Sequence, residues 1–238
     1  MAFDKQQIFQ EIKKCYTAIF GDALESVYIY GSATTDDFQE KYSDINVALI
    51  LKDISIKNLI KARDCIKLLR KKHVTAPLFL TKEHIIDSLD SFPIEFLNIK
   101  TSNLLLAGED FFEGITFTDR DIRLQAEREL KGKLLLLRAA LLENLDKKKI
   151  LSTVVINSFT ALMPVLKGIV FIMKSDIPKN TSDIIRKSEE VCGCDLSSFQ
   201  TALKIKNRAL KFNFEDFISF FENYITAVGQ LANYVDKL

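Results

Sequence analysis

Two pairs of residues, one after an apolar run and one at the start of the next, are of types that suit phosphate and metal chemistry. Gly31 and Ser32 follow a β-branched and aromatic run, and Asp44 and Asn46 open the next apolar run. Glycine lets a backbone approach a ligand closely, and a serine hydroxyl with nearby amide groups can hold phosphate oxygens. Residues two apart on a strand point to one face, so Asp44 and Asn46 project together. This geometry suits a hard cation such as magnesium, which prefers oxygen ligands.

The elements that position these residues alternate in type through the first half of the chain. Apolar residues at helical spacing alternate there with short β-branched or aromatic runs. Helices are expected over 4–20, 55–72 and 82–91, and strands over 27–30, 45–51, 78–80 and 94–97. This order predicts a sheet with helices packed on it.

Beyond Asp119 the helical period dominates, and the breaks between helices are brief. Five helices are expected, over 119–146, 150–173, 181–191, 196–212 and 214–237. Strands first and helices afterwards are typical of two folding units rather than one interleaved sheet. We therefore predict the α+β class, with a mixed sheet and its helices in a domain over 1–115 and an all-α helical bundle over 116–238.

The segment 28–51 resembles the polymerase-beta-type nucleotidyltransferase superfamily, whose hallmark is Gly-Ser, a polar loop and then Asp-x-Asp. The helical half is similar to the companion domain of kanamycin-type and related aminoglycoside nucleotidyltransferases. The resemblance implies transfer of a nucleotidyl group from a nucleoside triphosphate to a hydroxyl, with magnesium as cofactor. It assigns nucleotide binding to Gly31, Ser32 and Ser43, metal binding to Asp44 and the residue two positions on, and the ligand to a cleft between the domains.

Three departures from the family pattern leave the carboxylate set incomplete. Asn46 stands where the family has its second aspartate, and an amide brings no negative charge. The loop 34–38 is acidic where the family commonly carries Arg or Gly. The third carboxylate should fall by strand order within 76–80, which contains no acid. Glu95 is the remaining strand-like carboxylate downstream, so Asp44 and Glu95 are the candidate catalytic residues.

Three functions remain open. The departures favour a weak or inactive relative that binds a nucleotide or small ligand between its domains. Gly31, Ser32 and Asp44 favour instead an active magnesium-dependent enzyme that transfers a nucleotide to a hydroxyl of a small molecule. A partner in a toxin–antitoxin pair is the third alternative, because helical domains can join minimal nucleotidyltransferases.

Charge and composition limit the partners and the location. Lys+Arg 33 and Asp+Glu 32 nearly cancel to a net charge of +1, which argues against nucleic acid as a partner. The apolar stretch 150–173 contains Pro164 and Lys167, which favours a buried bundle helix over a membrane span. The four cysteines are expected to be reduced thiols in a cytoplasmic protein. The phenylalanine-rich stretch 212–221 suits core packing or a homodimer interface.

Overall fold

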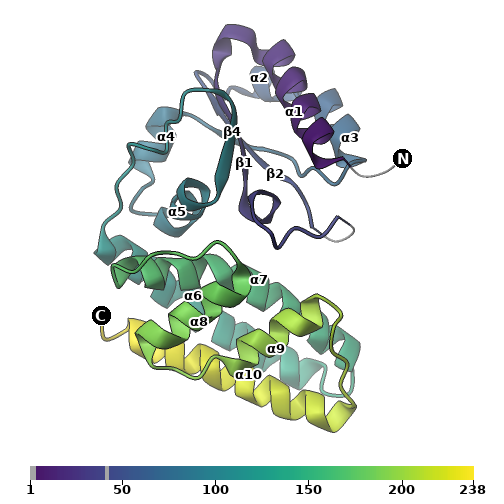
Figure 1. Cartoon of the computed structure of the whole chain (residues 1–238), viewed down its shortest axis with the longest axis vertical. Coiled ribbons are helices and arrows are strands. Elements are labelled where there is room, and N and C mark those ends of the chain that lie inside the picture. Colours follow the sequence, from purple (N-terminus) through teal and green to yellow (C-terminus); the bar gives the residue numbers. More distant parts are fainter. Residues whose placement is uncertain (1–3, 41–42) are drawn as a thin grey trace. The chain divides into compact units, whose positions relative to one another are not determined.

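The computed structural model describes residues 4–40 and 43–238 and divides the chain into two compact units (Figure 1). Unit 1 is Met1–Phe117 and holds all the described strands, whereas unit 2 is Thr118–Leu238 and is helical. The α+β class with a mixed sheet followed by helices is confirmed.

Unit 1 is built on a four-stranded mixed sheet in the order β3-β2-β1-β4. Its strands are β1 (Leu24–Tyr30), β2 (Asn46–Leu51), β3 (Leu78–Leu80) and β4 (Asn103–Gly108). β1 pairs antiparallel with both β2 and β4, and β2 pairs parallel with β3. The end of β1 therefore lies beside the start of β2, where Tyr30 is opposite Asn46.

Helices cover both faces of this sheet because the strands are apolar on both sides. Val27, Ile29 and Leu49 face one cluster, which the helices α1 (Lys5–Phe20) and α3 (Arg63–Arg70) complete. The alternate residues of the same strands face a second cluster with α4 (Lys82–Asp87), α5 (Pro93–Thr101) and the chain after β4. The short helix α2 (Ile56–Lys61) precedes α3, and the 3₁₀ turns η1 (Gly21–Ala23) and η2 (Gly31–Thr34) flank β1.

The fourth strand is not where the sequence predicts it. The segment 94–97 belongs to helix α5, with Pro93 in its first turn, where proline needs no hydrogen-bond partner for its nitrogen. Periodicity alone cannot separate a short apolar run in a strand from one in a buried helix. The fourth strand is β4, in a segment next to the expected domain junction. The expected helix 55–72 is divided at Ala62 into α2 and α3.

The expectation of four reduced thiols is wrong for Cys15 and Cys65, which form a disulfide. α1 and α3 pack against the same sheet face, and this brings the two Cα atoms to 6.3 Å although the residues are 50 apart in sequence. Cys192 and Cys194 are free. Burial raises the pKa of the Cys192 thiol to about 12, so this thiol stays protonated at neutral pH.

Unit 2 contains five described helices, which begin and end within three residues of the expected bounds, except that the fourth ends at Lys206 and not at residue 212. They are α6 (Asp119–Glu143), α7 (Lys148–Ile172), α8 (Thr181–Cys192), α9 (Ser197–Lys206) and α10 (Phe214–Val235). Side chains of Thr118, Asn180 and Asn213 accept backbone N–H groups in the first turns of α6, α8 and α10, which explains where these helices begin.

α7 is the central helix of this unit and contacts α6, α8, α9 and α10. By length and composition it could also cross a membrane, but 56% of its most apolar window is buried inside the protein, as in the core helix of a bundle. From α10, Phe217, Phe220 and Phe221 are buried in the core of the unit. Core packing thus accounts for these three phenylalanines, and a homodimer stays a prediction.

Two buried tyrosines differ in whether their hydroxyl groups are paired. Burial raises the pKa of Tyr16 far above its ordinary value, and its hydroxyl has no hydrogen-bond partner among the described residues. The Tyr224 hydroxyl instead lies 3.3 Å from Ser158 Oγ. We expect Tyr16→Phe to raise the free energy of unfolding by about 1 kcal/mol and Tyr224→Phe to lower it by a similar amount. Urea denaturation of the full chain measures both, and equal signs would contradict the assignment.

Candidate functional site

The turn after β1 gives Gly31 and Ser32 a fixed geometry at one end of the sheet. Gly31 has φ 75°, in the left-handed region that glycine adopts without strain, and its N–H donates to Ser102 O at 2.9 Å. The Thr34 hydroxyl donates back to Gly31 O at 2.8 Å. Among the described residues, none hydrogen-bonds to the Ser32 hydroxyl, and its backbone O accepts from the Thr35 hydroxyl at 3.2 Å.

Asn46 lies directly against this turn. Its Nδ2 is 3.3 Å from the position that a Cβ on Gly31 would occupy, so a side chain at residue 31 would crowd the amide. The Asn46 Oδ1 accepts from the Thr75 hydroxyl at 3.3 Å, and Thr75 N–H donates to Ile45 O at 3.0 Å. Asp44 is exposed just before β2. The structure therefore places Gly31, Ser32 and Asn46 together, with Asp44 close in sequence at the same end of the sheet.

Ser43 closes the polar loop. Its N–H donates to Gln39 O at 2.8 Å, and its hydroxyl accepts from Gln39 N–H at 3.0 Å. These bonds hold the loop just ahead of Asp44. Nucleotide binding by Ser43 stays a prediction.

Glu95 is not on a strand, as the sequence suggested, but in the first turn of α5, where its side chain is exposed. The other end of α5 is the one that meets the Gly31 turn, through Ser102. Seven residues at 1.5 Å of rise per residue place Glu95 about 10 Å further back along the helix. The structure therefore does not bring Glu95 to the turn, and a catalytic role for it has no geometric support.

The residues at this end of the sheet do not fit a pair of magnesium ions. Among the described residues, no three His, Cys, Asp or Glu side chains lie together as metal ligands. Asp44 contributes one carboxylate, and the amide oxygen of Asn46 is engaged by Thr75. Two-metal chemistry depends on ligands that hold both ions about the reacting phosphate, and one carboxylate with one engaged amide falls short.

Sequence reasoning missed two residues near the turn. Thr75 precedes β3, and only the parallel pairing of β2 with this segment shows that its side chain reaches Asn46. Lys5 begins α1, and its Nζ lies 5.2 Å from the ring centroid of Phe38. A hollow of about 260 Å³ lies there, lined by Lys5, Thr35, Asp36, Phe38 and Glu40. The acidic loop thus has a cation beside it that its own sequence lacks.

Thr75→Val is expected to lower the free energy of unfolding by about 1 kcal/mol, because valine keeps the shape but leaves Asn46 Oδ1 without its donor. Thr116→Val, at an exposed position in the same unit, is the control and should change the stability by less than about 0.5 kcal/mol. Urea denaturation with both variants measures the difference. Equal effects would show that the Thr75 hydroxyl contributes nothing.

Comparison with known proteins identifies the fold of the chain. No protein-family model matches the chain, and no curated protein matches it. Among solved structures, it is similar to the spectinomycin adenyltransferase AAD(9) from Enterococcus faecialis, whose crystal structure contains ATP and spectinomycin. The TM-score is 0.60 over 98% of this chain and 100% of that one, at 12% sequence identity. The chain has a nucleotidyltransferase fold.

This likeness confirms the resemblance in fold, and at so low an identity it shows the fold alone. A weaker similarity, with a TM-score of 0.29 and 14% identity, is to a mutant of the toxin–antitoxin MntA-HpeT and covers 45% of this chain and 75% of that one. Similarity at that level carries no argument about function. The nucleotidyltransferase fold therefore rests on the first comparison and on the geometry of the Gly31 turn.

Proposed function

We propose that this nucleotidyltransferase-fold protein binds a nucleotide or a small ligand at the Gly31 turn and is a weak or inactive transferase. The observation that carries the proposal is the position and hydrogen bonding of the Asn46 amide. Its amide oxygen accepts from the Thr75 hydroxyl and its amide nitrogen faces the space above Gly31, where an active relative would present a metal-binding aspartate. An amide that donates a hydrogen bond suits an anionic oxygen directly, without a metal between them.

Three further features support a phosphate-bearing ligand. The left-handed Gly31 permits close approach to the backbone, and the Ser32 hydroxyl, which no described residue engages, can donate to a ligand. Lys5 supplies positive charge beside the loop. AAD(9), which shares the fold, was crystallised with ATP and spectinomycin, and we carry the nucleotide class over from it.

Titration calorimetry of ATP and GTP, with and without magnesium, tests this proposal. We expect saturable binding whose affinity changes less than about tenfold on adding magnesium, because the metal set is incomplete. Ser32→Ala should weaken binding about three- to tenfold through loss of one hydrogen bond to phosphate. Thr153→Ala, an exposed hydroxyl on α7, is the matched control and should bind as the parent does. No saturable binding of either nucleotide would overturn the proposal.

Asp44 favours the second candidate, an active magnesium-dependent transferase, because it keeps the first acid of the motif. A pyrophosphate-release assay with ATP, magnesium and hydroxylated small molecules separates the two. Release that disappears in Asp44→Ala but persists in Asp64→Ala, an exposed acid on α3, would establish the active enzyme instead. A role in a toxin–antitoxin pair stays a prediction.

A further inference from the structure

A disulfide joins the two helices that cover one face of the sheet in unit 1. Cys15 lies in the second half of α1 and Cys65 near the start of α3, and their Sγ atoms are bonded. Cys65 is buried, whereas Cys15 is half-buried, so a small thiol in solution can approach the bond from the side of Cys15. An exposed disulfide is more easily reduced than a fully buried one. This bond therefore has the exposure of a reversible link.

Both helices are also held on the sheet by contacts that do not involve the disulfide. Ile8 and Ile12 from α1 and Leu69 from α3 are buried in the same core cluster. Glu11 on α1 forms an ion pair with Lys72, which lies just after α3. Reduction of the disulfide should therefore leave unit 1 folded but with its two helices less tightly joined. A switch between two folded states requires this property.

Both helices lead to the candidate site at the glycine turn. At the start of α1, Lys5 lies beside the acidic loop that follows the turn. After α3, the His73 carbonyl oxygen accepts from Ile45 N–H at 2.8 Å, two residues before Thr75. The Thr75 hydroxyl then donates to Asn46 Oδ1 at 3.3 Å. The disulfide thus ties together the two segments that supply Lys5 and Thr75 to the site.

We propose that the Cys15–Cys65 pair is a redox switch for the site at the glycine turn. The oxidised pair fixes α1 against α3 and so holds the segments that carry Lys5 and Thr75. The reduced pair lets the two helices move independently on the sheet. The effect on ligand binding rests on the proposed nucleotide site, whereas the change in helix mobility does not.

The redox step needs a partner that exchanges two electrons, and a small-molecule disulfide such as glutathione disulfide suffices. The Cys15–Cys65 bond forms, the sulfur–sulfur bond of the oxidant breaks, and the two thiol protons pass to the sulfurs of the oxidant. Two glutathione thiols reverse the step. Burial raises the pKa of both Cys192 and Cys194, so these thiols offer little thiolate to attack the bond at neutral pH.

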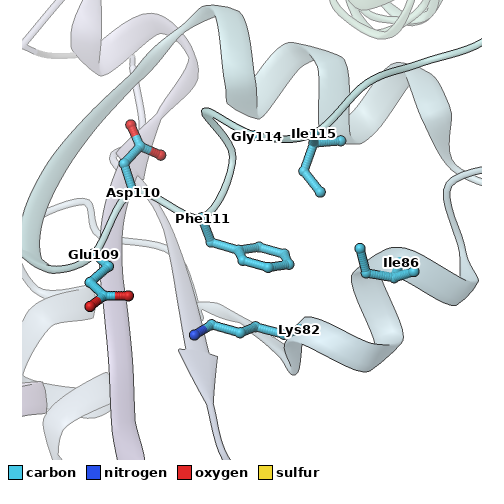
Figure 2. Close-up of a pocket in the computed structure, with 7 residues that line it drawn as sticks. All are labelled: Lys82, Ile86, Glu109, Asp110, Phe111, Gly114 and Ile115. Carbon is cyan, nitrogen blue, oxygen red and sulfur yellow. The ribbon is translucent and has the colours of Figure 1, made fainter.

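The opposite face of the same sheet provides an internal reference. There α4 and the chain after β4 meet without a covalent link, and the Lys82 Nζ stands 5.7 Å from the centroid of the Phe111 ring (Figure 2). Neither α4 nor the segment 109–117 contains a cysteine. Reduction of the disulfide should therefore leave the mobility of α4 unchanged.

Equilibration of the full chain in glutathione buffers of graded ratio tests whether the bond is reversible. Alkylation followed by peptide mass spectrometry measures the oxidised fraction of the Cys15–Cys65 pair. We expect this fraction to change from mostly reduced to mostly oxidised within the graded range. A pair that stays oxidised in every buffer would be a permanent link, and a pair that stays reduced would form no link. Either result would overturn the proposal.

Hydrogen exchange of the oxidised and reduced full chain measures the change in mobility. Reduction should speed amide exchange at least about tenfold over 5–20 and 63–75 and leave 82–87 unchanged. Cys65→Ala should exchange like the reduced chain with or without reductant. Cys194→Ala, which removes a free thiol from unit 2, should respond to reductant as the parent does. Equal exchange in the two forms would contradict the switch, as would equal acceleration over 82–87.

Titration of ATP into the two forms connects the switch to the site. The oxidised chain should bind ATP at least about threefold more tightly, because fewer groups must be ordered when the ligand binds. Equal affinity in the two forms would refute the regulation of this site. Absence of binding in both forms would instead overturn the proposed function, and the exchange experiment would then decide on the switch alone.

Discussion

Asn46→Asp is expected to raise the affinity for magnesium by about 10- to 100-fold. The substitution keeps the acceptor that the Thr75 hydroxyl uses, and it adds a negative charge two residues from Asp44. Two carboxylates on one strand face then offer a hard cation the oxygen ligands that it prefers. Titration calorimetry with magnesium, in the presence and absence of ATP, measures the gain.

The control for this substitution is Asn223→Asp, which adds the same charge at an exposed position on α10. It should leave magnesium affinity at the Gly31 turn unchanged, because water and salt screen a solvent-exposed charge that supplies no ligand at the turn. Unchanged affinity in Asn46→Asp would show that the turn has lost its metal geometry as well as its charge. Equal gains in the two variants would mean that the effect is non-specific attraction.

Gly108→Ala is expected to lower the free energy of unfolding by about 3 kcal/mol or more. Gly108 has φ 84°, in the left-handed region, and an added Cβ would lie 1.8 Å from Glu25 O and 2.9 Å from Ser26 Cα. Both atoms belong to the backbone of β1, which is paired on both sides within the sheet, so neither can move aside cheaply. The cost combines backbone strain with displacement of a central strand. Urea denaturation followed by circular dichroism measures it.

Gly114→Ala is the matched control in the same connection. Gly114 lies outside the left-handed region, and a Cβ there would meet nothing within 4 Å. Its substitution should change stability by less than about 0.5 kcal/mol. A loss below about 1 kcal/mol in Gly108→Ala would contradict the close approach of β4 to β1 at Glu25.

Local sequence signals were sufficient for most elements of the chain. The alternation of apolar runs located β1, β2 and β3. The helical period located the ends of the five helices of unit 2 within three residues, apart from the end of α9, which lies six residues before the predicted one. Both signals depend on neighbours in sequence, which is why they can be read without the fold. The Gly31-Ser32 turn and the Asp44-Asn46 motif were found in the same way, because each lies at the end of an apolar run.

Short apolar runs marked the limit of this reasoning. The run around Glu95 carries no period that separates strand from helix, and Pro93 fits the start of either. The strand β4 was missed because it is an edge strand of mixed exposure that ends in glycine, next to a junction that the sequence also marks. Together, these two errors led to the prediction that Glu95, the candidate for the third carboxylate, lies on a strand.

The sequence by itself therefore determined the α+β class, the glycine turn and the loss of the second aspartate. Only the tertiary structure decided which residues complete the site. Thr75 reaches Asn46 through pairing beside β2, Lys5 reaches the loop at Phe38, and Cys15 meets Cys65. Each of these contacts joins residues far apart in the chain, and it arises from how strands pair and helices pack against a shared core. No periodicity within a single segment encodes such a contact, since its partners belong to different segments.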